Sequence, residues 1–238
     1  MWYTFDQAEG TTVTDQSGNG NDGTLEGGAG WDTGYIGNAV DLNGKDGLVH
    51  LPTGLLKNVD NVTISTWVKV DQVRNFQRIF DFGIDTSKNM FLTPHSAHTN
   101  AEGLMFGITT SGGGQEDRIA KKSAIETNKW THVALVIDGS TGLLYENGVE
   151  VARNNNLQVK PSDLGETVQN YIGKSIYAAD PYLDGRIDDF RIYRRALNDS
   201  EIKSLTYYSD EAFVTKTKEF LNLEDIHAVT DDLKLPTK

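Results

Sequence analysis

The chain has 238 residues, contains no cysteine and carries a formal net charge of −12 at pH 7. The absence of thiols excludes disulfides, thiolate metal sites and cysteine catalysis. So acidic a chain lacks the basic surface by which proteins bind nucleic acids or anionic membranes. No apolar run reaches the roughly 18 residues that a membrane span needs, and the acidic side chains remain available for cations or sugar hydroxyls.

Short apolar segments and 24 glycines predict a protein of β-strands joined by tight turns. Residues 2–6 are the first expected strand, and residues 62–70 alternate between apolar and polar side chains. Residues 130–138 are apolar in both phases, which is typical of a strand buried on two faces. In residues 143–152, two strand segments flank Asn147-Gly148, the preferred pair for a two-residue type I′ turn.

The last expected strand covers residues 185–193, and Asn198 with Glu201 forms a capping box that predicts a short helix through about residue 205. Residues 209–238 contain no glycine and have a helical pattern around residues 211–221. About 30 residues cannot bury a core of their own. We therefore expect one domain over residues 1–208, followed by the start of a truncated second domain or by a packed tail. Because a strand follows Met1 directly, we expect a cloned piece of a longer protein.

The order of these segments resembles the laminin-G-like, concanavalin A-type modules. The matching segments are residues 2–6, 15–25, 37–44, 63–68, 130–134, 144–148 and 185–193, with Ala196-Leu197. Residues 79–83 and 90–94 look like the version attached to secreted bacterial glycoside hydrolases, and residues 213–236 are similar to the start of an immunoglobulin-like domain. The resemblance implies an all-β fold, an antiparallel β-sandwich of the jelly-roll type with a short C-terminal helix and a tail. It also implies secretion or display on a bacterial cell surface.

Residues 15–22 combine three kinds of potential oxygen ligand: carboxylates, amides and the carbonyls of a glycine-rich turn. Calcium takes about six to eight such oxygens, although a plain surface turn has the same composition. Asp188 alternates in phase with Phe190, so we expect it on the buried side, where a carboxylate needs a calcium or arginine partner. The resemblance implies a structural calcium ion that joins the two segments. Its expected ligands are Asp15, Gly18, Asn19, Asn21 and Asp188, with Asp6 as a further candidate.

The sequence contains no arrangement typical of a catalytic site. Jelly-roll glycanases place acids on alternate residues of one strand, whereas Glu116-Asp117 and Asp188-Asp189 are adjacent pairs whose members should point to opposite faces. The five histidines have no zinc-site spacing. We therefore expect no independent catalysis, and an unrecognised glycanase or lyase is the less favoured alternative.

Two regions combine aromatic rings with charged side chains, which a sugar site needs for stacking and for bidentate hydrogen bonds. The first consists of Arg78, Asp81, Phe91, Thr93, His95 and Phe106 with Gln115, Asp117 and Arg118, and the other is the loop 177–182, with two tyrosines and the acid Asp180. The expected ligand-binding residues are Arg78, Asp81, His95, Asp117, Arg118, Tyr177 and Tyr182. Two alternatives remain open, an internal salt bridge between Arg78 and Asp81 and burial of the neighbouring phenylalanines in the core.

These features predict a non-catalytic carbohydrate-binding module that holds an attached glycoside hydrolase near a polysaccharide. Tethering raises the effective concentration, so weak binding at one site suffices. The acidic surface favours neutral glycans, because like charges repel. The alternatives are a spacer that packs against its catalytic neighbour and a protein-interaction or adhesion module. We expect a monomer that neither binds nucleic acid nor inserts into a membrane.

Overall fold

The computed structural model describes residues 1–96 and 103–207. The predicted helix around residues 211–221 and the predicted truncated domain therefore lie outside the described residues. The described part contains sixteen strands, one 3₁₀-helix and one α-helix. In chain order these are β1 (Trp2–Tyr3), β2 (Thr12–Val13), β3 (Gly23–Glu26), β4 (Gly30–Thr33), β5 (Asn38–Asn43), β6 (Leu48–His50), β7 (Val62–Val70), β8 (Phe80–Asp85), β9 (Lys88–Thr93), β10 (Met105–Thr109), β11 (Asp117–Ala120), β12 (Thr131–Asp138), β13 (Thr141–Glu146), β14 (Val149–Asn154), η1 (Pro161–Leu164), β15 (Gln169–Ile172), β16 (Asp184–Tyr193) and α1 (Asp199–Tyr207).

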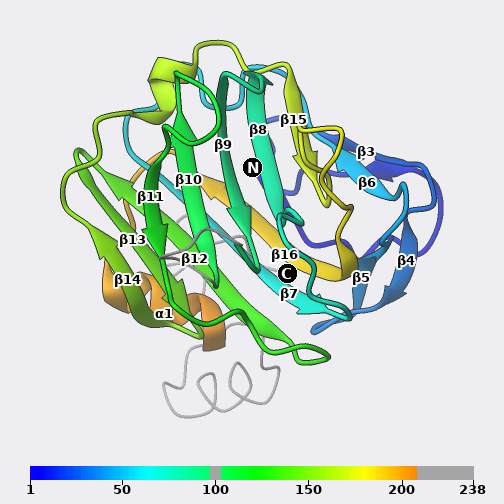
Figure 1. The fold of residues 1–238 in the computed structure, drawn as a ribbon. Helices are drawn as coiled ribbons and strands as arrows, with labels where there is room; N and C mark the ends of the chain where they lie inside the picture. Colours follow the sequence, from blue (N-terminus) through cyan, green and yellow to red (C-terminus); the bar gives the residue numbers. More distant parts are fainter. Residues whose placement is uncertain (97–102, 208–238) are drawn as a thin grey trace.

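The strands form two eight-stranded antiparallel sheets that pack face to face (Figure 1). The front sheet has the order β11-β10-β9-β8-β15-β6-β3-β2. The back sheet has the order β14-β13-β12-β7-β16-β5-β4, with β1 paired to β16. Neighbours in the sheets are distant in the chain, as expected of a sandwich with crossing connections. The predicted all-β antiparallel sandwich is confirmed.

The core lies between the sheets and follows the alternation of side chains along the strands. In the front sheet, the rings of Phe80 and Phe82 stack at 4.8 Å between centroids and meet Phe190 of the back sheet edge to face, at 6.3 and 6.5 Å. Phe106 is fully buried in the same cluster, so these rings are core residues as the sequence analysis allowed. Because the even-numbered residues of β8 and β10 fill the core, the odd-numbered ones project from the outer face of the front sheet.

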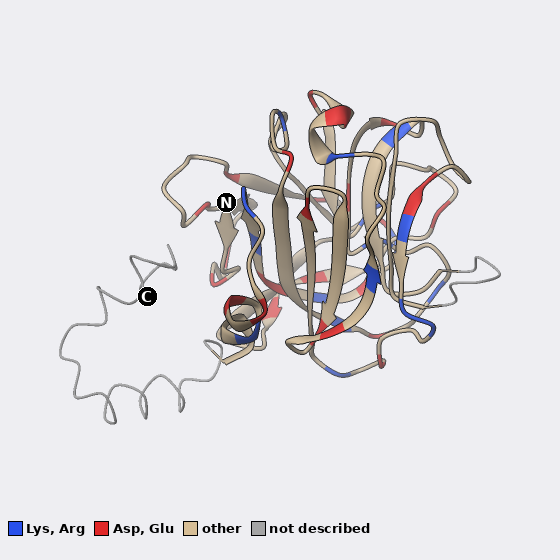
Figure 2. Cartoon of the chain, turned by 90° about the vertical axis from the view of Figure 1, so that its left-hand side faces the viewer, with Lys and Arg blue, Asp and Glu red and all other residues tan. Residues whose placement is uncertain are grey.

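Helix α1 covers part of the outer face of the back sheet. Figure 2 shows the two sheets from their edges, with the helix outside them. Its Ile202 and Leu205 pack on Ala134, Val136 and Tyr145 in a second, smaller apolar cluster. The predicted capping box is present: the Asn198 side chain accepts a hydrogen bond from the Glu201 amide at 3.0 Å, and the Glu201 carboxylate accepts one from the Asn198 amide at 2.8 Å.

Backbone dihedral angles account for both a confirmed turn and a shortened strand. Asn147 and Gly148 have φ values of 51° and 77°, as the predicted type I′ turn requires. The first expected strand ends at Tyr3 instead of residue 6, because Phe5 takes a φ of 54° that no extended strand allows.

A bulge in β16 corrects the expected orientation of Asp188. The pairing with β7 shifts between Asp188 and Arg191, and Asp189 has a φ of 51°. One residue is therefore inserted into the alternation. Asp188 pairs with Trp67 on the outer face, while Phe190 points into the core. Asp188 is buried, with 1% exposure, but it does not share a face with Phe190.

Candidate functional site

The strand pairing places one row of residues across the outer face of the front sheet. Asp81 pairs with Phe91, Phe91 with Gly107, and Gly107 with Arg118. Directly paired residues in antiparallel strands project to the same side of the sheet. Side chains from β8, β9 and β11 therefore converge on the glycine of β10.

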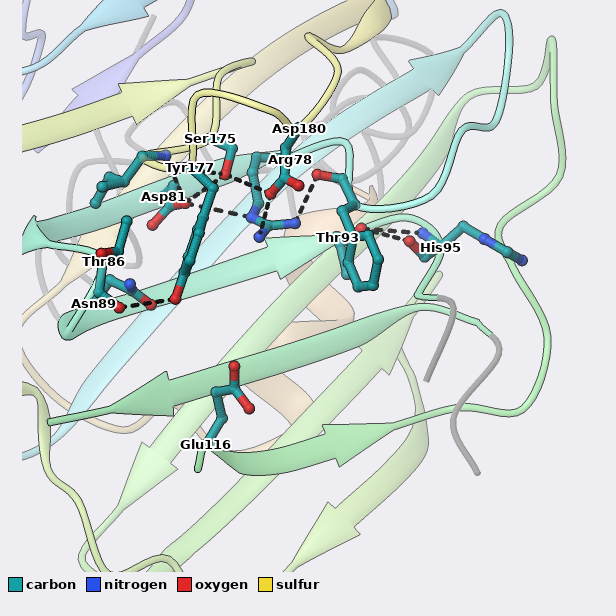
Figure 3. Close-up of polar contacts among 12 residues, drawn as sticks. Arg78, Asp81, Thr86, Asn89, Thr93, His95, Glu116, Ser175, Tyr177 and Asp180 are labelled. Carbon is teal, nitrogen blue, oxygen red and sulfur yellow. Dashed lines mark hydrogen bonds and ion pairs between the residues drawn. The ribbon is translucent and has the colours of Figure 1, made fainter. Parts of the chain in front are cut away.

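Arg78 and Asp81 form a buried ion pair at the centre of this face (Figure 3). Arg78 Nε lies 3.3 Å from Asp81 Oδ2, and the two side chains are 3% and 0% exposed. The guanidinium carbon of Arg78 lies 4.0 Å from the centroid of the Phe91 ring, which is a close cation–π contact. The structure therefore contains the internal salt bridge between Arg78 and Asp81 that the sequence left open as an alternative.

The loop between β15 and β16 lies over the ion pair and is anchored to it. Arg78 Nη2 donates to the Asp180 carboxylate at 3.0 Å, and Ser175 Oγ donates to the same carboxylate at 2.8 Å. The Ile176 amide donates to Asp81 Oδ2 at 3.0 Å. These contacts fix the loop that carries Tyr177 and Tyr182.

Burial raises the pKa of Asp81 from an ordinary 3.8 to about 6, even though Arg78 and the Ile176 amide favour its ionised form. Desolvation penalises the charged state of a carboxyl that has no contact with solvent. The second oxygen of this carboxyl, Oδ1, has no hydrogen-bond partner among the described residues.

Unpaired polar atoms gather around this face. Four of the ten buried side-chain atoms that lack a hydrogen-bond partner within the described residues are Asp81 Oδ1, Asn89 Oδ1, His95 Nδ1 and Arg118 Nε. Asn89 precedes Phe91 by two residues on β9, and His95 follows the end of that strand. Buried polar atoms are normally paired, so this face is a candidate site for a polar ligand.

Glu116 and Arg118 provide a charged pair at the edge of the face. Arg118 Nη2 lies 2.6 Å from a Glu116 carboxylate oxygen, and Arg118 remains 30% exposed. Burial alone raises the pKa of Glu116, but the hydrogen bond from Arg118 holds it below its ordinary range. A Cβ on Gly107 would come within 2.8 Å of the Phe91 ring, so only glycine fits beneath this pair.

Tyr177 borders the same area from the loop. Its hydroxyl donates to the Thr86 carbonyl at 2.8 Å and lies beside the Asn89 side chain. Burial raises the pKa of Tyr177, so the hydroxyl stays protonated. The half-buried ring thus stands over β9 and can offer an edge or a face to a ligand.

The structure brings together five of the seven predicted ligand-binding residues, namely Arg78, Asp81, His95, Arg118 and Tyr177. Asp117 points to the other side of β11, where its carboxylate accepts hydrogen bonds from the amides of Gln158 and Val159 at 2.5 and 2.8 Å. Tyr182 lies near Tyr171, and its carbonyl accepts a hydrogen bond from the Gln77 side-chain amide at 3.1 Å.

Sequence reasoning missed Glu116, Asn89 and Ser175 as members of this site, and it placed Asp180 in a region separate from Arg78 and Asp81. Glu116 could have been chosen over Asp117 only with the register of β11 known, because adjacent residues point to opposite faces. Ser175 and Asp180 join only because the loop folds back over the sheet.

Of the predicted calcium ligands, Asp15 and Asn21 contact each other, because Asp15 Oδ2 accepts hydrogen bonds from the main-chain and side-chain amides of Asn21 at 3.1 and 3.2 Å. Asp15 accepts hydrogen bonds from the amides of Trp2, Ser17 and Asn21 at 2.8, 3.0 and 3.1 Å, so both its oxygens are used within its own loop. Gly18 and Asn19 lie at the exposed tip of that loop. The structure describes no cluster of three or more acidic or histidine side chains positioned to hold a metal in residues 1–96 and 103–207.

Asp188 has different neighbours from Asp15. Its carboxylate accepts the Ile36 amide at 2.9 Å, and Asp6 lies close enough to influence its charge. Asp6 itself accepts the Asn38 amide at 3.2 Å. The two carboxylates therefore flank the same short loop, residues 34–38, and Asp6 takes the place beside Asp188 that was expected of Asp15.

Comparisons with known proteins agree with this fold. A family model described as the concanavalin A-like lectin/glucanases superfamily matches residues 43–203. Domain 4 of a GH43 extracellular arabinanase from Geobacillus stearothermophilus, solved in complex with arabinotriose, is 28% identical, with a TM-score of 0.74 over 86% of this chain and 96% of that one.

A curated α-L-arabinofuranosidase from Bifidobacterium longum is 32% identical over 108 residues, which is 45% of this chain. The chain spans only 10% of that relative's length. The CBM40 of a Ruminococcus gnavus sialidase, bound to α2,3-sialyllactose, is 18% identical, with a TM-score of 0.56 over 71% of this chain and 96% of that one. This last similarity shows the shared fold alone.

Proposed function

The chain belongs to the concanavalin A-like lectin/glucanase superfamily, and on this basis we propose that it is a non-catalytic carbohydrate-binding module. Its ligand is a neutral oligosaccharide containing arabinose, bound on the outer face of the front sheet. The arabinotriose complex of the similar arabinanase domain and the arabinofuranosidase relative support this choice of sugar.

The observation that carries the proposal is the concentration of unpaired buried polar atoms around Phe91. The amide of Asn89, the imidazole of His95 and the guanidinium of Arg118 together offer both donors and acceptors. A sugar hydroxyl both donates and accepts, so it satisfies such a mixed set better than a purely anionic or cationic ligand does. Lys and Arg are scattered over strands and loops in Figure 2, which also favours a neutral ligand over a polyanion.

Each member of the site has a distinct role. Arg118 and Glu116 hold adjacent ring hydroxyls through charge-assisted hydrogen bonds, and the Tyr177 ring packs on an apolar sugar face. Arg78, Asp81 and Asp180 act from below, because they fix the loop on which Tyr177 stands. Loss of their contacts would displace Tyr177 without removing any group that touches the ligand.

The state of the carboxyl groups favours binding over hydrolysis. Glycoside hydrolysis needs two carboxyl groups that flank the bond to be broken. Here Asp81 is 0% exposed beneath the loop, and Glu116 is held by Arg118. Glu116 is therefore left to hold a hydroxyl and Asp81 to support the loop.

The module would keep an attached catalytic domain near its polysaccharide. The matched arabinanase is extracellular, and we extend that location to this chain. No helix within the described ranges is long and apolar enough to cross a membrane. A spacer that binds no sugar is the second candidate. The observation that favours it is the burial of the Arg78–Asp81 ion pair, because a structural role alone would explain that pair.

Structural calcium remains a proposal. Asp6 and Asp188 are its candidate ligands, because each carries fewer hydrogen bonds from main-chain amides than Asp15 does and so keeps more oxygen lone pairs for a calcium ion. Added calcium should raise the melting temperature of the chelator-treated wild type and of an Asp15→Asn variant. It should leave the melting temperature of an Asp188→Asn variant unchanged.

Calorimetric titration with arabinotriose tests the proposed function. The variants Arg118→Met and Tyr177→Ala should each weaken binding by at least about tenfold. Arg153→Ala is the matched control, since Arg153 also pairs with a glutamate but lies on β14 and is 46% exposed. Binding that survives both site variants would contradict this site, and a folded wild type that binds no neutral glycan would favour the spacer.

A further inference from the structure

A second group of aromatic rings lies on the opposite face of the molecule, on the outer side of the back sheet. Tyr35 stacks on Trp67 with 3.7 Å between ring centroids and 14° between planes, and it meets Trp130 nearly edge-on at 6.2 Å. Trp67 is 5% exposed, whereas Tyr35 is 39% exposed. One face of the tyrosine ring is thus covered by Trp67, and its other face is open.

The exposed ring is held in a fixed position from beneath. Trp67 packs edge-on against His132 at 5.4 Å, and the two residues are direct partners on β7 and β12. The neighbouring Ile36 amide is fixed by the Asp188 carboxylate at 2.9 Å. Tyr35 therefore has little freedom to lose when a ligand stacks on it, which lowers the entropic cost of binding.

Charged side chains border these rings. Arg186 pairs with both Lys69 and Asp41 across the strands, so all three project from the same outer face. Arg186 Nε lies 3.0 Å from an oxygen of Asp32 and 3.4 Å from one of Asp41. Thr131 pairs with Val68, and Trp130, one residue earlier, therefore comes next to Lys69. Aromatic faces and charges of both signs thus lie side by side.

We propose that Tyr35 and Trp130 form a second carbohydrate-binding site for a neutral sugar ring. The ring stacks on the open face of Tyr35, and Trp130 forms the adjoining wall. Lys69 and the Arg186–Asp32 pair hold its hydroxyls, because mixed charge suits a neutral polyhydroxyl ligand better than an acidic one. The inference rests on the proposed function for the class of ligand, but it uses none of the residues of the front-sheet site.

A module with two sites binds a polysaccharide differently from a module with one site. They lie on opposite outer faces of the sandwich, so they engage separate chains or distant parts of one chain. Two weak contacts of this kind raise the overall affinity for an insoluble polysaccharide well above that for a short oligosaccharide.

Titration with arabinotriose, followed by nuclear magnetic resonance of the indole N–H groups and the backbone amides, tests the second site. The Trp130 indole signal should shift with saturation in the wild type. It should shift equally in Arg118→Met, which disables only the front-sheet site. In Tyr35→Ala the Trp130 shift should be lost, while the amides of β10 and β11 still respond.

Two further variants control for folding. Tyr35→Leu keeps apolar packing on Trp67 but removes the aromatic face, so it should lose the Trp130 shift as well. Tyr207→Ala removes a tyrosine of similar exposure, 43%, from α1 and should behave as the wild type. Response of β10 and β11 without any Trp130 shift would overturn the second site and leave the proposed function intact. Absence of both responses in the folded wild type would contradict both proposals.

Discussion

Replacement of Arg78 by methionine should destabilise the protein in a way that depends on pH. Methionine keeps an unbranched side chain over Phe91 but removes the guanidinium that pairs with Asp81 at 3.3 Å. Asp81 would then have no cation beside it while remaining fully buried. Removal of one partner of a buried ion pair typically costs about 3–5 kcal/mol.

The pKa of Asp81 sets the pH range of this effect. In the wild type it is raised from 3.8 to about 6, so the folded chain holds this proton more tightly than the unfolded chain. The contribution of Asp81 to stability therefore falls as pH rises from about 4 to 6, by about 3 kcal/mol in total, and then levels off. In Arg78→Met the pKa rises further, so the fall continues above pH 6 by up to about 1.4 kcal/mol per pH unit.

Urea unfolding at pH 5, 6, 7 and 8, followed by tryptophan fluorescence, measures the difference between variant and wild type. The difference should be smallest at pH 5, where Asp81 is protonated in both proteins, and should grow toward pH 8. The double variant R78M/D81N should lose this pH dependence, because its residue 81 carries no charge. A constant difference across the four pH values would refute the argument that the cation of Arg78 holds Asp81 ionised.

Three further predictions concern stability. Burial lowers the pKa of His132 to about 4, so the free energy of unfolding of the wild type should fall by up to about 3 kcal/mol as pH drops from 6.5 toward 4. The variant His132→Gln, compared by urea unfolding, should lack this loss. Asp15→Ala leaves the amides of Trp2, Ser17 and Asn21 unpaired and should cost about 3 kcal/mol in chemical denaturation, whereas an unchanged midpoint would show that water replaces the carboxylate. Gly148→Ala should lower the melting temperature and cost about 1 kcal/mol or more, since its φ is 77° and a Cβ would come within 3.3 Å of Thr206 Cγ2; an equal or higher melting temperature would contradict this.

Local patterns in the sequence predicted those strands and that turn whose structure is set by residues close together in the chain. The strand at Val62–Val70 and the Asn147-Gly148 turn follow from alternation and from the need for positive φ. The helix start at Asn198 follows from a capping box that involves only four residues. In each case the cause lies within a few positions of the chain, and a single sequence contains it.

Features that depend on distant pairing were not predicted. The bulge at Asp189 changes the face on which Asp188 lies, and no local pattern marks it. Asp180 joins the site only because a loop folds back over the ion pair of Arg78 and Asp81. The sequence could propose Arg78, Asp81, His95 and Arg118 in one region and Tyr177 in another, but it could not join the two regions or choose between Glu116 and Asp117 without the register of β11.

A crystal structure of the protein with arabinotriose is the sharpest test of the sugar site on the front sheet. We expect a sugar on the outer face of the front sheet, with hydroxyls within hydrogen-bond distance of Glu116 and Arg118 and a ring against Tyr177. The loop anchored by Asp180 should keep its position. Arabinotriose bound only elsewhere on the molecule, with the polar groups around Phe91 left unpaired, would rule out the front-sheet site.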